Sequence, residues 1–176
     1  MAKRVFKSDL STNGIDQLKK DLLYYKNNIL HQKVNLLAKL LADKGVEIAK
    51  VNVARLDAIF TGELINSIHA EKGSSINGTA IFYIVADSEH AAYVEFGTGQ
   101  MGAEGSYPYP FPPGVDWQYN TGKTIFEISP GQYGWFYPGD DGKWYFTQGM
   151  PSRPFMYETT MELMKHVVST AKEVFK

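Results

Sequence analysis

The sequence predicts an α+β protein in which an antiparallel β-sheet packs against a long N-terminal helix and a C-terminal helix. Apolar residues follow a helical spacing at both ends of the chain, and short runs rich in β-branched and aromatic residues lie between them. Residues 100–149 are rich in proline and aromatic residues, and we expect them to form an inserted loop and β-hairpin. With 176 residues and 44% hydrophobic residues, the chain can form a single domain, 1–176, with its own core.

The N-terminal helix is predicted from apolar residues that recur every three or four positions. Asn13 suits the N-cap, and Asp16 would lie in the first turn, near the positive end of the helix dipole. Residues 14–44 would span about 46 Å at ~1.5 Å per residue, so the helix crosses a whole sheet or projects beyond it. Gly45 either ends this helix or is a weak point in a longer one. The apolar stripe favours a core role, and its excess length favours a contact with other subunits. Its members are Leu18, Leu22, Tyr25, Ile29, Leu30, Val34, Leu37 and Leu41.

The middle of the chain contains two predicted strands. Asn77-Gly78 within 74–78 is a turn signal, because both residues accept the positive φ angles of a tight hairpin. Residues 80–86 are all apolar and predict a strand buried on both faces. Residues 92–96 predict a second, shorter strand.

The segment 98–150 differs in composition from the rest of the chain. It holds 13 of the 24 aromatic residues and six of the eight prolines. Residues 124–128 predict a short strand. Residues 132–137 and 143–147 flank the turn sequence 138–142, which indicates a hairpin. Because linkers lack aromatic residues, we expect this segment to pack on the domain or on a neighbouring subunit.

The C-terminal helix is predicted over 154–176, starting where Arg153-Pro154 places a proline at the first helical turn. Its predicted apolar face is made of Met156, Thr160, Leu163, Met164, Val167, Val168, Ala171 and Val174.

Charge and cysteine content exclude several functions. The net charge of −1 argues against a global electrostatic attraction to nucleic acid or to a membrane surface. Residues 1–50 carry ten basic and five acidic residues, a net of +5, whereas 80–150 carry two and eight, a net of −6. This asymmetry suits head-to-tail contact between copies, or simply a solvated basic helix and an acidic loop. The absence of cysteine rules out disulfides and thiolate zinc sites, and no apolar run is long enough for a signal peptide or a membrane span.

No pattern in the sequence predicts a catalytic, cofactor or metal site, and we expect the chain not to be an enzyme. The four histidines lack metal-ligand spacing. Ser88-Glu89-His90 are neighbours in a turn and cannot converge as a triad. Gly97 and Gly99 lack the Gly-Lys-Ser/Thr ending of a phosphate loop, and 140–142 lacks the length of a calcium loop.

The tryptophans offer an alternative function. Trp117, Trp135 and Trp144 have the stacking surface of a carbohydrate-binding module. Stacking on nucleic-acid bases is disfavoured because the segment is acidic. The interpretation that we favour is a satellite core or a subunit interface, where Tyr and Trp are enriched.

Three motifs in order resemble the tail-completion, or head–tail joining (neck), proteins of long-tailed bacteriophages and prophages. The first is Thr61-Gly62-Glu63-Leu64-Ile65-Asn66-Ser67-Ile68, and the second is Tyr93-Val94-Glu95-Phe96-Gly97-Thr98-Gly99. The third is Arg153-Pro154-Phe155-Met156, with Glu158 close behind. The resemblance covers about 14–99 and 150–176 and leaves 100–149 as an insertion particular to this chain.

The resemblance implies a structural virion protein, a minor tail or neck component without enzymatic activity. Such a protein contacts other neck and tail proteins, often as a homo-oligomeric ring, and is found in the virion and, during assembly, in the host cytoplasm. We hypothesise that Glu95 accepts hydrogen bonds from backbone N–H groups or pairs with Arg153, and so fixes the turn beside the C-terminal helix. The alternative is an exposed Glu on an edge strand. The predicted structural turn and interface residues are Glu95, Phe96, Gly97, Thr98, Gly99, Arg153, Pro154, Phe155, Trp135 and Trp144.

Overall fold

The computed structural model describes residues 5–58, 62–75, 80–104, 107–108, 110–115, 117 and 125–176, and it confirms the α+β class. The described residues belong to two compact units. The first unit draws on Met1–Ile48, His69–Val85 and Met161–Lys176. The second draws on Ala49–Ile68 and Ala86–Thr160.

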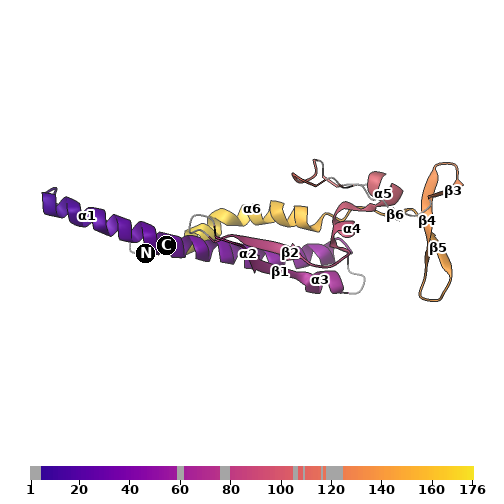
Figure 1. Ribbon diagram of the computed structural model, residues 1–176, viewed down its shortest axis with the longest axis horizontal. Coiled ribbons are helices and arrows are strands. Elements are labelled where there is room, and N and C mark those ends of the chain that lie inside the picture. Colours follow the sequence, from indigo (N-terminus) through magenta and orange to yellow (C-terminus); the bar gives the residue numbers. More distant parts are fainter. Residues whose placement is uncertain are drawn as a thin grey trace. The chain divides into compact units, whose positions relative to one another are not determined.

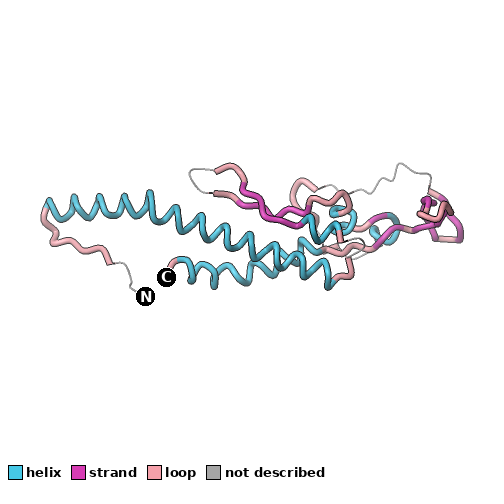
Figure 2. The backbone as a smooth tube through the Cα atoms, turned by 90° about the horizontal axis from the view of Figure 1, so that it is seen from below, coloured by secondary structure: helices cyan, strands magenta, loops and turns pink. Residues whose placement is uncertain are grey.

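The N-terminal half is a continuous helical run. Helix α1 (Thr12–Tyr24) leads into a π-helical turn, η1 (Tyr25–Leu30), and then into α2 (His31–Arg55), as Figure 2 shows. The prediction that Asn13 caps the helix is wrong. Ser11 is the N-cap, and its Oγ accepts a hydrogen bond from the Gly14 amide at 3.0 Å. Ser11 lies three residues before the Gly14 amide, which is the spacing of an N-cap hydrogen bond, whereas Asn13 lies inside the helix.

Gly45 does not end the helix but allows a close approach within the first unit. A Cβ atom at this position would lie 2.2 Å from Ile84 Cδ1 and 3.2 Å from Leu163 Cδ2. Ile84 belongs to strand β2 (Phe82–Ala86) and Leu163 to helix α6 (Phe155–Val174). The glycine therefore serves the packing of strand and helix side chains against α2.

Strand β1 (Ile68–Lys72) pairs with β2 in a two-stranded sheet of the first unit, which runs along α2 in Figure 1. The Asn35 side chain accepts a hydrogen bond from the Ala80 amide at 2.9 Å, and Lys33 Nζ donates to the Val174 carbonyl at 2.7 Å. The prediction that 80–86 is buried on both faces is wrong, since Tyr83 on β2 is 53% exposed. Helices that pack against a two-stranded sheet cover only one of its faces, and the other face is left to solvent. The predicted Asn77-Gly78 turn lies outside the described residues.

The second unit contains the remaining short elements (Figure 1). They are α3 (Glu63–Ser67), α4 (Ala91–Phe96), α5 (Gly99–Glu104), β3 (Phe126–Ser129), β4 (Gln132–Pro138), β5 (Trp144–Thr147) and β6 (Gly149–Met150).

The predicted strand over 92–96 is the helix α4 instead. The chain turns at Ser88, whose carbonyl accepts the Ala91 amide at 3.0 Å, and the helix closes where the Gly97 amide donates to the Tyr93 carbonyl at 2.9 Å. Tyr, Val and Phe favour strands, but a run this short has no periodicity that separates helix from strand.

The predicted hairpin is confirmed and belongs to a three-stranded antiparallel sheet, β3-β4-β5. Phe126 pairs with Gly134, and Phe136 pairs with Phe146. The rings of Phe126, Phe136 and Phe146 follow one another at 5.6 and 5.3 Å in edge-on contacts. One face of the sheet therefore carries a ladder of phenylalanines.

Helix α6 confirms the predicted C-terminal helix but not its predicted face. Met164 and Val168 are exposed, whereas Thr159 and Thr170 are buried with Phe155 and Val174. Thr159 and Thr170 each donate to the carbonyl four residues earlier, at 2.6 and 2.9 Å. Because the hydroxyls are satisfied within the helix, their methyl groups can pack inward.

Candidate functional site: a carboxylate junction at the start of helix α6

The segment Gly97-Thr98-Gly99 crosses the chain just before α6. Thr98 forms an antiparallel bridge with Met150, as does Gly99 with Gly149, and Thr98 Oγ1 accepts the Met150 amide at 3.0 Å. Both ends of the predicted insertion 100–149 therefore meet at one place.

Two glycines make this crossing possible. Gly97 and Gly99 have φ angles of +78° and +61°, in the left-handed region that disfavours side chains. A Cβ at Gly97 would lie 2.7 Å from the Ser152 amide nitrogen, and one at Gly99 would lie 2.5 Å from the Gln148 carbonyl oxygen. The second motif is thus pressed against the backbone of 148–152, the segment that leads into the third motif.

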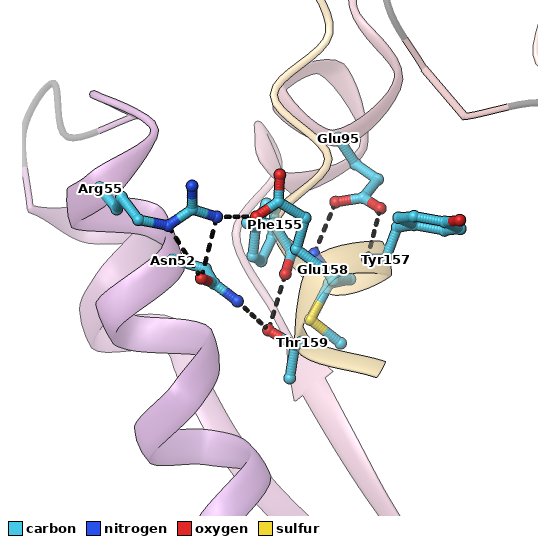
Figure 3. Close-up of polar contacts among 8 residues, drawn as sticks. Asn52, Arg55, Glu95, Phe155, Tyr157, Glu158 and Thr159 are labelled. Carbon is cyan, nitrogen blue, oxygen red and sulfur yellow. Dashed lines mark hydrogen bonds and ion pairs between the residues drawn. The ribbon is translucent and has the colours of Figure 1, made fainter. Parts of the chain in front are cut away.

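Glu95 joins α4 to the first turn of α6 (Figure 3). Its Oε2 accepts a hydrogen bond from the Met156 amide at 2.8 Å, and its Oε1 accepts one from the Tyr157 amide at 3.0 Å. The first amides of a helix have no partner within the helix, and the positive end of the helix dipole favours a carboxylate there. Glu95 therefore caps α6 from a position about sixty residues earlier in the chain.

Burial raises the pKa of the Glu95 carboxyl, and the bonds from the Met156 and Tyr157 amides lower it by less. The side chain is only 6% exposed. Glu95 also contributes to a raised pKa of the Tyr107 phenol, for which burial is the larger cause. The carboxylate is thus a buried charge whose partners are backbone dipoles.

The hypothesis that Glu95 accepts backbone N–H groups agrees with this geometry. Its alternative, an ion pair with Arg153, is not among the ion pairs of the described residues. Arg153 contributes through its backbone, because its amide donates to the Val94 carbonyl at 2.8 Å. Ser152 Oγ donates to the Glu95 carbonyl at 2.6 Å. The end of α4 is therefore bonded to 152–157 through side chain and backbone alike.

A second polar network joins the last turns of α2 to α6 (Figure 3). The buried Asn52 donates from Nδ2 to Thr159 Oγ1 at 3.2 Å. Its Oδ1 accepts from Arg55 Nη2 at 3.2 Å, and Arg55 forms an ion pair with Glu158. The sequence pattern does not predict a role for Asn52, Arg55 or Thr159 at this site. The one sequence signal for this network was that Glu158 follows the third motif. Side-chain pairs between residues far apart in the chain leave no local spacing pattern that the sequence could show.

An aromatic cluster packs around Phe96. Its ring lies 4.9 Å from Tyr107, 5.6 Å from Phe111 and 5.2 Å from Trp117. Tyr107 stacks on Phe111 and meets Tyr157 of α6 edge-on. Trp117 Nε1 donates to the Gly97 carbonyl at 3.0 Å. These rings form a satellite core beside the Glu95 junction, which is one of the two roles that we favoured for the aromatic residues.

The two other tryptophans differ in exposure. Trp135 is 6% exposed and its ring packs on Gly99, whereas Trp144 is 68% exposed.

Gln100 links the residues next to Gly99 to the β3–β4 turn. Its side chain donates to the Gly131 carbonyl at 2.8 Å and accepts from the Tyr133 amide at 2.9 Å. Pro154 and Phe155 complete the junction, and the Phe155 side chain is fully buried.

The junction can hold segments together, but its groups are already satisfied by one another. Every buried side-chain nitrogen or oxygen in the described residues has a hydrogen-bond partner. Those residues also contain no group of three or more His, Asp or Glu side chains placed to hold a metal ion. Across the same part of the chain, no helix has the length and hydropathy needed to cross a membrane.

Comparison with known protein families, with curated proteins and with solved structures finds no match to this chain.

Proposed function

We propose that this chain is a structural protein of the head–tail connection or tail completion of a long-tailed phage or prophage, acting by protein–protein assembly. The observation that carries the proposal is the direct contact between two of the three motifs. Glu95 of the second motif binds the amides of Met156 and Tyr157, at the end of the third. This contact gives a physical reason for the two motifs to occur together in one chain.

The exposed apolar surface supports an assembly role. Helix α1 has no buried residue, although Ile15, Leu22 and Leu23 lie on it. Exposed apolar surface of this kind marks a site for a protein partner. The proposal places the protein in the virion and, during assembly, in the host cytoplasm.

The carbohydrate-binding alternative has less support. A sugar platform needs accessible rings, but Trp135 is buried and the Trp117 ring contacts Phe96. Trp144 is the exposed tryptophan of the three. Titration of the chain with oligosaccharides, followed by tryptophan fluorescence, tests this alternative: saturable quenching that Trp144→Ala abolishes would favour it.

Deletion of the gene from the phage or prophage that encodes it tests the main proposal. We expect induced lysates to contain filled heads and separate tails that do not join, visible by electron microscopy. Purified chain added to such a lysate should restore joined particles and plaque formation. Glu95→Ala should restore fewer joined particles than wild type, and the matched control is Glu162→Ala, which changes an exposed residue on α6 and should restore them fully. Normal particles after the deletion would contradict the proposal.

A further inference from the structure

Helix α1 carries an apolar stripe that is open to solvent. Ile15 is 49% and Leu22 is 46% exposed, and Leu18 between them is half-buried. A shallow groove on this face is lined by Ile15, Leu18, Lys19, Leu22, Leu23 and Lys26.

The spacing of the stripe is that of a coiled-coil seam. Ile15, Leu18, Leu22 and Tyr25 follow one another at three, four and three residues, which are a and d positions of a heptad. Ile15, Leu18, Lys19 and Leu22 in the groove have the i, i+3, i+4, i+7 spacing of the hole that receives a knob from a facing helix. The ring of Tyr25 contacts Phe6, and η1 begins there, so the open stripe is confined to α1.

The charges beside the stripe select the orientation of a partner helix. Lys19 and Lys26 occupy the two e positions, and Asp21 occupies the g position between them. In a parallel pair of identical helices, a g residue faces the e residue five positions later on the partner, so Asp21 faces Lys26 on both sides. In an antiparallel pair, e faces e and g faces g, which sets lysine against lysine and aspartate against aspartate.

We propose that α1 pairs in parallel and in register with α1 of a second copy of this chain. Leu18 of each copy enters the hole made by Ile15, Leu18, Lys19 and Leu22 of the other. Asp21 also accepts a hydrogen bond from Gln17 at 2.9 Å within its own helix, and its second oxygen remains an acceptor for the partner's lysine. The pairing identifies the surface for one contact of the protein–protein assembly in the proposed function, and it rests on the proposed function only in that respect.

Sedimentation of the full chain over about 1 to 500 µM tests the pairing. We expect reversible association beyond the monomer that weakens with added salt. Leu22→Glu should weaken it by about tenfold or more, because it places a charge in the seam. Tyr24→Glu is the matched control, since Tyr24 is exposed on the same helix but lies away from the seam. Asp21→Lys should weaken association, and the double variant Asp21→Lys with Lys26→Asp should recover it.

A cysteine variant tests the orientation, and the chain has no cysteine of its own. In a parallel pair in register, the two copies of residue 18 face each other within disulfide reach. Oxidised Leu18→Cys should therefore form a covalent dimer that a reductant reverses, whereas Tyr24→Cys should form no covalent dimer.

Several outcomes would overturn the pairing. A wild-type chain that stays monomeric throughout the range would do so, as would association that Leu22→Glu leaves unchanged or a Leu18→Cys chain that does not cross-link. None of these results bears on the deletion phenotype, so this inference and the proposed function can fail separately.

Discussion

The Glu95 junction and helix α1 differ in two respects: which residue caps the free amides at the start of the helix, and whether the apolar side chains are buried. At the junction, a carboxylate from α4 binds the first amides of α6, and Phe155 beside it is fully buried. On α1, the cap is local, from Ser11 to Gly14, and the helix has no buried residue. The junction is complete within one chain, whereas α1 leaves an apolar stripe for something outside it.

Buried apolar residues at the junction and exposed apolar residues on α1 therefore have different roles. Apolar residues that are buried within their own chain contribute to the free energy of unfolding, because unfolding exposes them to water. Apolar residues already in water contribute little to that free energy and can contribute to association instead. Mutations at the two regions should therefore affect different measurements.

Phe155→Ala should have the largest effect on stability. A fully buried phenylalanine truncated to alanine leaves a cavity, and we expect a loss of about 3–5 kcal/mol of unfolding free energy. Urea denaturation followed by circular dichroism measures it. Tyr24→Ala on α1, an aromatic truncation at an exposed site, should change stability by less than about 0.5 kcal/mol. Equal losses at the two sites would remove the contrast between the regions.

Glu95→Ala should be next, with a loss of about 2–4 kcal/mol, because two amides at a buried helix end lose their acceptor. The matched control is Glu162→Ala, which removes an exposed carboxylate from α6 and should be nearly neutral. Protease sensitivity of the 150–157 segment should rise in Glu95→Ala alone. A stable Glu95→Ala chain would mean that the junction does not need its carboxylate.

Gly97→Ala should cost more than Gly142→Ala by about 1–3 kcal/mol. Both glycines have positive φ, of +78° and +73°, so both substitutions introduce backbone strain. At Gly97 the new Cβ also meets the Ser152 amide nitrogen at 2.7 Å, whereas at Gly142 nothing lies within 4 Å. The difference in unfolding free energy isolates the close approach at the junction. Equal losses of unfolding free energy for the two variants would show that the backbone at Gly97 can move away from Ser152 without loss of stability.

The pH dependence of Glu95 should be the smallest effect. Burial raises the pKa of its carboxyl above the ordinary 4.5 in the folded state, so the folded chain holds this proton more tightly than the unfolded chain. Its contribution to stability is therefore greatest below the ordinary pKa and declines as the pH rises through the raised value. Relative to Glu95→Gln, wild type should lose unfolding free energy as the pH rises above the ordinary pKa of 4.5. If wild type instead gained unfolding free energy relative to Glu95→Gln as the pH rises, the pKa of Glu95 would be lowered on folding and not raised.

Local pattern was enough for the long elements. The helical spacing predicted the N-terminal and C-terminal helices, and the turn sequence 138–142 between aromatic runs predicted the β4–β5 hairpin. These features depend on neighbours within a few residues, which the sequence displays directly. The sequence also singled out Glu95, Gly97 and Gly99 as a turn next to the C-terminal helix.

Only the tertiary structure decided how these pieces are joined. It made 92–96 a helix, turned Thr159 inward in place of Met164, and brought Asn52 and Arg55 to α6. Each outcome depends on partners about sixty or more residues away, whose packing outweighs local preference. The sequence by itself determined the two long terminal helices and the turn of the β4–β5 hairpin. The tertiary structure determined that Glu95 caps α6, because a capping carboxylate is selected by its distance in space from free amides and not by its distance along the chain.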